Sequence, residues 1–218
     1  MNRRTILASM LNLAGGAAAL SSGVAAAAVK PRPGPRAGYF PNFVLTTHEG
    51  KSVRFYDDLM RGKTVMVNFM YTHCGGICPT QTANLVKVQR QLGARVGRDI
   101  FMYSITLEPW IDKPEVLNRY AQGFRVGPGW LFLTGKTSEI ETIRRAVGFV
   151  DPDPQLDRER TSHIGVVLYG IESLDRWAMY PALGRPEVLA HNVVALSGER
   201  PWSPLFRKTV PPAPRQAG

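Results

Sequence analysis

Cysteine is scarce in this sequence, and the candidate chemistry is correspondingly concentrated. Only Cys74 and Cys78 occur among the 218 residues. The methionines are scattered without a Met-x-x-Met cluster, so we interpret them as core residues rather than metal ligands. No element combines clustered lysine and arginine with aromatic residues, which argues against a nucleic-acid-binding protein. There is also no internal repeat.

Acidic residues are absent from both ends of the chain. None precedes Glu49 and none follows Glu199, so much of the formal net charge of +10 lies in the terminal segments. We expect this basic charge to favour contact with an anionic membrane surface or an acidic partner protein. A general contribution to solubility is the alternative.

The first 28 residues are predicted to be an export signal. Arg3 and Arg4 form a charged start, an uncharged run follows, and Ala25-Ala26-Ala27 offers a small-x-small cleavage site. Residues 2–7 resemble a twin-arginine signal, whose cargo crosses the membrane already folded. No cysteine follows the run directly, which excludes a lipid anchor there. We therefore expect a periplasmic protein; an uncleaved anchor in the inner membrane, facing the periplasm, is the alternative.

The rest of the chain divides into a linker, one domain and a tail. Residues 29–41 are rich in proline and form the predicted linker. Residues 42–196 are the predicted domain, and residues 197–218, with five prolines, are predicted to be a disordered tail. An apolar content of 44% with 20% charged residues is typical of a globular domain.

Hydrophobic periodicity predicts an α/β domain. Strands are expected at 43–45, 52–55, 64–70, 100–107, 130–133, 166–169 and 175–180, and helices at 78–92, 113–124, 138–147 and 186–196. The order implies a central mixed β-sheet with helices on both faces, preceded by an N-terminal β-hairpin around Glu49-Gly50. The last two strands are predicted to turn near Gly170, and residues 151–162 to form a polar loop.

The two cysteines lie at the turn between a buried strand and a helix. Gly75 and Gly76 between them permit a tight loop that turns both sulfurs toward one point. Cys78 is expected at the helix N-terminus, where the helix dipole would favour its thiolate. Two such thiolates suit a soft ion such as Cu(I), or a reversible disulfide. A purely stabilising disulfide is the alternative.

This segment resembles the signature of the Sco/SenC family, Thr-x-Cys-x-x-x-Cys-Pro after a buried strand. The stretch 106–117 is similar to that family's Thr-x-Asp-Pro-x-x-Asp-Thr-Pro-x-x-Leu pattern, and 129–135 follows its Trp/Leu-Thr-Gly pattern. Ser162-His163 precedes a strand as the family's metal-binding histidine does. The resemblance extends from about Phe43 to Leu196. Glu108, Gly75-Gly76 and Ile164 depart from the usual residues.

The resemblance implies a thioredoxin-like three-layer fold that binds one copper ion per chain, with Cys74, Cys78 and His163 as ligands. Family members deliver copper to the binuclear site of cytochrome c oxidase subunit II, or reduce that site's cysteines. We therefore predict a copper metallochaperone whose partners are that subunit or another copper-receiving protein, a copper donor and a thiol reductase. The same Cys74 and Cys78 would form the redox pair.

Other polar residues are predicted to have minor roles. His73 is expected to point away from the sulfurs, and His48 and His191 to lie on the solvated surface. For His163 a loop histidine bonded to the backbone is the alternative. Asp151 and Asp153 lie in a proline-punctuated loop and are predicted to form turns rather than to bind a metal. A hard-cation site would also need more oxygen ligands.

Two further functions stay open. A periplasmic thiol-disulfide oxidoreductase would use the same cysteine pair, but thioredoxins have Cys-x-x-Cys and a cis-proline where residues 160–164 of this chain have none. A copper or redox sensor that acts by binding alone is the third hypothesis.

Overall fold

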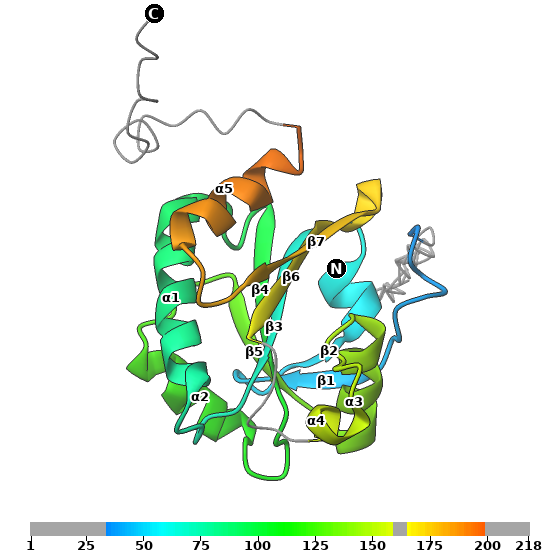
Figure 1. Cartoon of the computed structure of the whole chain (residues 1–218), viewed down its shortest axis with the longest axis vertical. Helices are drawn as coiled ribbons and strands as arrows, with labels where there is room; N and C mark the ends of the chain where they lie inside the picture. The colour runs from blue at the N-terminus through cyan, green and yellow to red at the C-terminus, as the bar shows by residue number, and fades with distance from the viewer. Residues whose placement is uncertain (1–33, 159–164, 199–218) are drawn as a thin grey trace, which may run out of the picture. The chain divides into compact units, whose positions relative to one another are not determined.

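The computed structural model describes residues 34–158 and 165–198, coloured in Figure 1. The strands are β1 Val44–Thr47, β2 Ser52–Arg54, β3 Thr64–Met70, β4 Ile100–Thr106, β5 Trp130–Thr134, β6 Val166–Ile171 and β7 Arg176–Pro181. The α-helices are α1 Ile77–Leu92, α2 Pro114–Gly123, α3 Thr137–Ala146, α4 Pro154–Arg158 and α5 Pro186–Ala195. Short helical turns occupy Phe55–Met60, Gly93–Arg95 and Glu172–Leu174.

The seven strands form one mixed sheet in the order β2-β1-β5-β4-β3-β6-β7. The three central strands β3, β4 and β5 are parallel to one another, and the other pairings are antiparallel. Consequently β3, β4 and β5 all end at the same edge of the sheet, and each is followed by a helix. This is the edge where open α/β sheets carry their functional sites.

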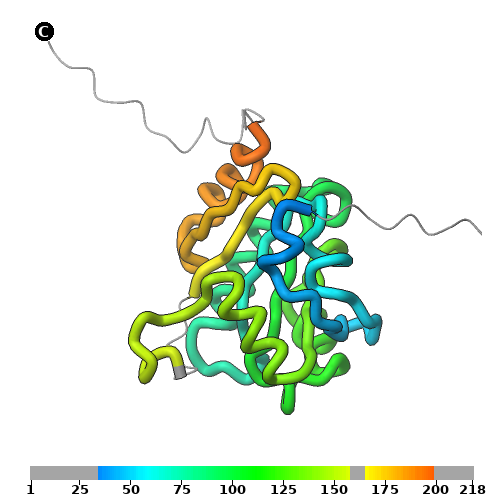
Figure 2. Tube along the Cα trace, turned by 90° about the vertical axis from the view of Figure 1, so that its right-hand side faces the viewer, coloured from blue at the N-terminus to red at the C-terminus, as the bar shows by residue number. Residues whose placement is uncertain are grey.

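Alternation along β3 explains the three layers. Met66 and Met70 pack on one face with side chains of α1, α2 and α5, whereas Val65, Val67 and Phe69 pack on the other with α3 and the Phe55–Met60 turn. Both faces of this strand are therefore buried, as its nearly continuous apolar run predicts. Figures 1 and 2 show α1 and α5 on one side of the sheet and α3 on the other. The predicted α/β fold with a mixed sheet is confirmed.

The predicted pairing of the last two strands is confirmed, but their turn does not lie at Gly170. Strand β6 continues to Ile171, and the chain reverses through Glu172–Leu174 and Asp175, which has a positive φ of 49°. Gly170 lies within β6 opposite Trp177. A Cβ at this position would come within 2.2 Å of the Trp177 ring, which explains why the residue is glycine. The glycine makes room for this ring instead of forming the turn.

The predicted polar loop 151–162 contains the short helix α4. Asp153 accepts a hydrogen bond from the main-chain N–H of Gln155 at 2.8 Å, and Asp151 accepts one from Asp153 N at 2.9 Å. The turn-forming role predicted for both acids is therefore confirmed. A buried ion pair holds the helix: Arg144 donates to both carboxylate oxygens of Asp157 at 2.7 and 2.8 Å, and both side chains are 5% exposed.

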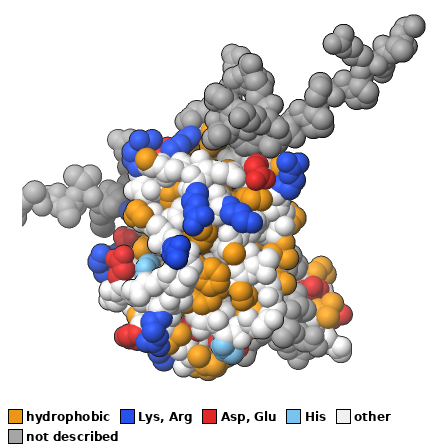
Figure 3. Space-filling view, turned by 90° about the vertical axis from the view of Figure 1, so that its left-hand side faces the viewer, with side chains coloured by type: hydrophobic (Ala, Val, Ile, Leu, Met, Phe, Trp, Pro, Cys, Tyr) orange, Lys and Arg blue, Asp and Glu red, His pale blue; other side chains and the backbone are white. Residues whose placement is uncertain are grey.

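Two predictions about the surface can be compared with the structure. Most methionines of the described ranges are buried, as expected, but Met179 on β7 is 44% exposed. Figure 3 shows more lysine and arginine than acidic side chains on the face that α1 and α2 cover, so the basic charge is not confined to the ends. Among the described residues, no helix is long and apolar enough to cross a membrane. The predicted signal, and the predicted tail after residue 198, lie outside the described residues.

Candidate functional site

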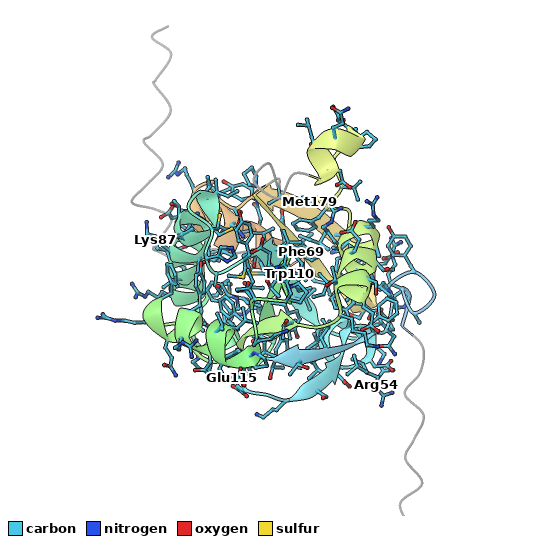
Figure 4. The ribbon with its side chains drawn as sticks, turned by 90° about the horizontal axis from the view of Figure 1, so that it is seen from below. Arg54, Phe69, Lys87, Trp110, Glu115 and Met179 are labelled. Atoms are coloured by element: carbon cyan, nitrogen blue, oxygen red, sulfur yellow. The ribbon has the colours of Figure 1, made fainter. Side chains whose placement is uncertain are left out.

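Cys78 lies in the first turn of α1, and Cys74 lies in the turn that connects β3 to α1. This connecting turn begins after Met70 and ends where α1 starts at Ile77, at the carboxyl end of the parallel strands. The adjacent turn from β4 to α2 lies at the same end of the sheet and exposes Trp110, whose exposed fraction is 43%. Figure 4 views the domain from below, and the labelled Trp110 lies near the middle of this end.

A fully buried carboxylate ties these two turns together. Asp112 accepts hydrogen bonds from the main-chain N–H of Thr72 at 3.1 Å and from its hydroxyl at 2.5 Å. The Thr106 hydroxyl at the end of β4 donates to the same carboxylate at 2.5 Å. Bonds to an ionised acceptor are among the stronger ones in proteins. The backbone two residues before Cys74 is therefore held firmly against β4.

Cys74 is the more reactive of the two thiols. It is half-buried and free, and burial alone would raise its pKa. Hydrogen bonds from the Tyr71 hydroxyl and from the main-chain N–H groups of Cys78 and Gly76 outweigh this burial, so the pKa of Cys74 is lowered below its ordinary value. A lowered pKa increases the thiolate fraction at neutral pH, and the thiolate is both the nucleophile and the metal ligand.

Cys78 behaves in the opposite way. Its side chain is buried in the hydrophobic cluster beneath α1, and this burial raises the pKa of its thiol to about 12. The prediction that the helix N-terminus favours the Cys78 thiolate is therefore wrong. The main-chain N–H groups of Cys78 and Gly76 bond to the sulfur of Cys74. The sulfur of Cys78 also accepts main-chain hydrogen bonds, from Tyr71 and from Cys78 itself, but its burial outweighs them.

His73 is bound to the β4–α2 turn. Its Nε2 lies 3.0 Å from Oε2 of Glu108, and its ring packs edge-on against Tyr71 at 5.4 Å between centroids. The side chain of His73 is 53% exposed, whereas that of Glu108 is 10% exposed. The departure from the family's aspartate at position 108 thus supplies a longer side chain that reaches the residue next to Cys74.

His163 lies outside the described residues. The chain resumes at Gly165, where an added Cβ would lie 2.9 Å from Ile77 Cδ1 and 3.4 Å from Gln81 Oε1. Position 165 is therefore beside the first turn of α1. Within the described ranges, no three His, Cys, Asp or Glu side chains group together as a metal site.

The remaining histidines differ from expectation in part. His48 is half-buried and its Nδ1 accepts a hydrogen bond from the main-chain N–H of Phe132 at 3.1 Å, so the prediction of a solvated surface residue is wrong. Burial lowers the pKa of His48, which favours the neutral ring that this bond requires. His191 is half-buried on α5.

Comparisons of the sequence and of the structure with known proteins point to the same family. The family model described as SCO1/SenC matches residues 32–170. The SCO1 protein homolog of Bacillus subtilis is 33% identical over 101 residues, which are 45% of this chain and 51% of that protein. The chain thus aligns with about half the length of this curated relative.

Solved structures show the same fold. A BsSco structure, described as a member of the Sco family of cytochrome c oxidase assembly proteins with a disulfide switch, has a TM-score of 0.60 at 23% identity and covers 74% of this chain and 94% of its own. The copper-bound ScoI of Arabidopsis thaliana has a TM-score of 0.57 at 23% identity and covers 73% of this chain and 98% of its own. At these identities the likeness establishes the fold.

Proposed function

Since the chain belongs to the SCO1/SenC family, we propose that it is a copper-binding metallochaperone with copper as its cargo. Cys74 and Cys78 would bind one copper ion per chain, and the client would be the binuclear copper site of cytochrome c oxidase subunit II or another copper-receiving protein. A copper donor and a thiol reductase complete the proposed set of partners. The related structures, one described as a cytochrome c oxidase assembly protein and one as a copper-bound ScoI, support this proposal.

The arrangement of the two thiols carries the proposal. Cys74 and Cys78 interact with each other at the start of α1, and both are free. Two sulfurs form a donor set that suits Cu(I), and the described residues add no cluster of three His, Cys, Asp or Glu side chains around them. Cys74 is the accessible thiolate, whereas Cys78 supplies a sulfur from the apolar side of the site. Binding of copper at Cys78 requires loss of its proton, so copper binding should release protons.

His163 is the proposed third ligand. The next described residue after it, Gly165, lies beside the first turn of α1, and this supports the choice. A neutral imidazole is a borderline ligand that suits Cu(II) as well as Cu(I). We therefore expect His163 to matter most when the bound ion is Cu(II).

A thiol-disulfide reductase is the second candidate, and the asymmetry of the two thiols favours it. A half-buried thiol with a lowered pKa followed by a buried thiol with a raised pKa is an arrangement that can attack a disulfide and then resolve the mixed disulfide. In that reaction Cys74 and Cys78 lose two electrons and two protons, and the partner's disulfide becomes two thiols. A copper or redox sensor would use the same pair without transfer.

The test is the copper stoichiometry of the reduced protein. We expect one Cu(I) per chain for the wild type, and loss of tight binding in both Cys74→Ser and Cys78→Ser. The matched control is Met179→Leu, which removes an exposed sulfur elsewhere and should leave the stoichiometry unchanged. Undiminished Cu(I) binding by the double cysteine variant would overturn the proposal.

A second variant decides between the two candidate functions. In a copper site, His163→Ala should weaken Cu(II) binding strongly and change its absorption spectrum, while Cys74 and Cys78 still form their disulfide. A general reductase predicts unchanged copper affinity and a shifted reduction potential. Copper delivery itself requires transfer from the loaded protein to the copper-site domain of the oxidase subunit.

The proposed location is the periplasm, after export by the twin-arginine route. We expect a mature N-terminus near Ala28 in the periplasmic fraction, and loss of export when Arg3 and Arg4 are both replaced by Lys. Recovery of an intact Met1 terminus in the membrane fraction would instead support an inner-membrane anchor.

A further inference from the structure

A groove of about 580 Å³ lies at the same edge of the sheet as the cysteines, next to the ends of β4 and β5. Its floor is the sheet surface around Val44, Thr46 and Thr134, and its walls include the starts of α2 and α3. None of the residues assigned above to copper or thiol chemistry lines it. The groove is therefore a separate feature of this end of the domain.

Two helix N-termini meet at this groove, and the residue that precedes each helix is a lysine. Lys113 precedes α2 and Lys136 precedes α3, and neither helix start has a side-chain cap. Ser, Thr, Asp and Asn are the preferred residues at this position because they accept hydrogen bonds from the first amides of the helix. A cation there also opposes the positive end of the helix dipole.

The two lysines differ in how much positive potential they add to that of the helix dipoles. The ammonium group of Lys113 donates to the carbonyl of Pro109 at 2.9 Å, so this contact leaves its charge without a carboxylate. Lys136 is paired with Glu139 at 2.9 Å, with side-chain exposures of 80% and 19%. Lys113 is thus the stronger source of positive charge in the groove, and the Lys136–Glu139 pair is close to neutral.

A buried hydroxyl supplies an independent observation. Thr134 lines the groove, is 6% exposed, and its Oγ1 has no hydrogen-bond partner among the described residues. Trp130 and Phe132 of the same strand pack into the cluster beside α1 and α2, so alternation along β5 turns Thr134 to that side, where α2 begins. A buried hydroxyl without a partner costs free energy that a ligand would recover.

We propose that this groove binds an oxyanion of the phosphate class, either free or as the headgroup of an anionic lipid. Lys113 would supply the charge, the first amides of α3 would supply main-chain donors, and Thr134 would donate its hydroxyl. Anions bind at helix N-termini for the same reasons in other proteins. The inference is independent of the proposed copper chemistry, because it uses none of its residues.

The first test is a titration of the whole ¹⁵N-labelled chain with inorganic phosphate at constant ionic strength, followed by amide shifts. We expect shifts concentrated at residues 113–116 and 134–139. Lys113→Gln should weaken phosphate binding about tenfold or more, because a hydrogen bond to a charged group is lost. The matched control, Lys87→Gln, removes an exposed lysine of α1 and should leave the affinity unchanged.

Thr134→Val separates a binding role from a structural one. Removing an unpartnered buried hydroxyl should leave the melting temperature unchanged or raise it, while phosphate affinity falls. Equal weakening in Lys113→Gln and Lys87→Gln, or shifts spread evenly over the basic surface, would mean an adventitious ion only and would overturn the proposal.

A second arm distinguishes the two sources of phosphate. Vesicles of phosphatidylglycerol would be compared with vesicles of phosphatidylcholine in a flotation assay. Binding to the anionic vesicles that free phosphate and Lys113→Gln both abolish would identify a lipid headgroup as the ligand. Site-specific phosphate binding without vesicle binding would identify a free anion.

Discussion

The hydroxyl of Tyr71 is predicted to set the reactivity of Cys74, and Tyr71→Phe removes this hydroxyl alone. The ring that packs against His73 is retained in the variant. Tyr71 itself has a pKa raised to about 12, chiefly because of its hydrogen bond to Cys74 and its burial. The hydroxyl therefore remains protonated, and remains a donor, throughout the range in which Cys74 titrates.

The magnitude follows from the strength of this bond. A hydrogen bond to a charged group contributes about 1.5–3 kcal/mol, and about 1.4 kcal/mol corresponds to one pKa unit. Because Cys74 is only half-buried, water would replace part of the lost bond, which reduces the expected effect. We expect the pKa of Cys74 to rise by about 1 unit in Tyr71→Phe, so that less thiolate is present at neutral pH.

The assay is the rate of alkylation of the reduced protein by iodoacetamide as a function of pH. The matched control is Tyr120→Phe. The hydroxyl that this variant loses lies 3.0 Å from Thr82 Oγ1 and is not a hydrogen-bond donor to Cys74. The profile of the control should overlay that of the wild type, and the profile of Tyr71→Phe should move to higher pH. Overlapping profiles for all three proteins, with equal melting temperatures, would refute the role of Tyr71 and leave the main-chain donors as the cause.

Three further predictions concern stability and are measured by urea unfolding. Asp157→Asn should lower the free energy of unfolding by about 3 kcal/mol at neutral pH, the lower end of the range for a broken buried ion pair, because the buried Arg144 keeps only the more exposed carboxylate of Glu141. The pKa of Asp157 is lowered chiefly by its bond to Arg144, so its contribution is present above about pH 4 and the two proteins should converge as the pH falls further. Burial lowers the pKa of His48, so the wild type should lose stability as the pH falls through about 6.5, and His48→Gln should remove that dependence. Gly129→Ala should lower the free energy of unfolding by at least about 3 kcal/mol, because its φ is +80° and a Cβ would lie 2.2 Å from a main-chain nitrogen. Gly50→Ala is the control: its φ of +81° is similar but the space around it is open, so the loss should be only about 1–2 kcal/mol. Equal losses at the two glycines, a similar effect of Asp157→Asn at all pH values, or an unchanged pH dependence in His48→Gln would each contradict the respective reasoning.

Local patterns predicted the architecture well, because each depends on a few neighbouring residues. The apolar run 64–70 indicated a strand buried on both faces, and β3 has those bounds. Pro114 and Pro186 open helices in the structure as their fixed φ favours. The prediction of a turn at Gly170 failed because glycine occurs both in turns and where a neighbouring side chain packs closely. The sequence could not distinguish the two, since Trp177 reaches Gly170 only through the pairing of the strands.

For the candidate site, too, some features were predictable from the sequence and others depended on the tertiary structure. The spacing of Cys74 and Cys78 and their place between a strand and a helix are properties of the sequence, and they led to the pair. Which thiol is acidic depends on partners elsewhere: the Tyr71 hydroxyl and the main-chain donors reach Cys74, whereas the apolar cluster under α1 surrounds Cys78. A helix N-terminus alone predicted the opposite assignment.

By itself, then, the sequence determined the order of the elements, the buried faces of the central strands and the residues able to carry thiol chemistry, because periodicity and residue type act locally. The tertiary structure decided which groups meet across distant segments. It brought Asp112 to Thr72, Glu108 to His73, and the starts of α2 and α3 to one groove. Hydrogen bonds, burial and electrostatic potential act between groups that are close in space, and parallel strands brought these groups together because all three end at one edge of the sheet.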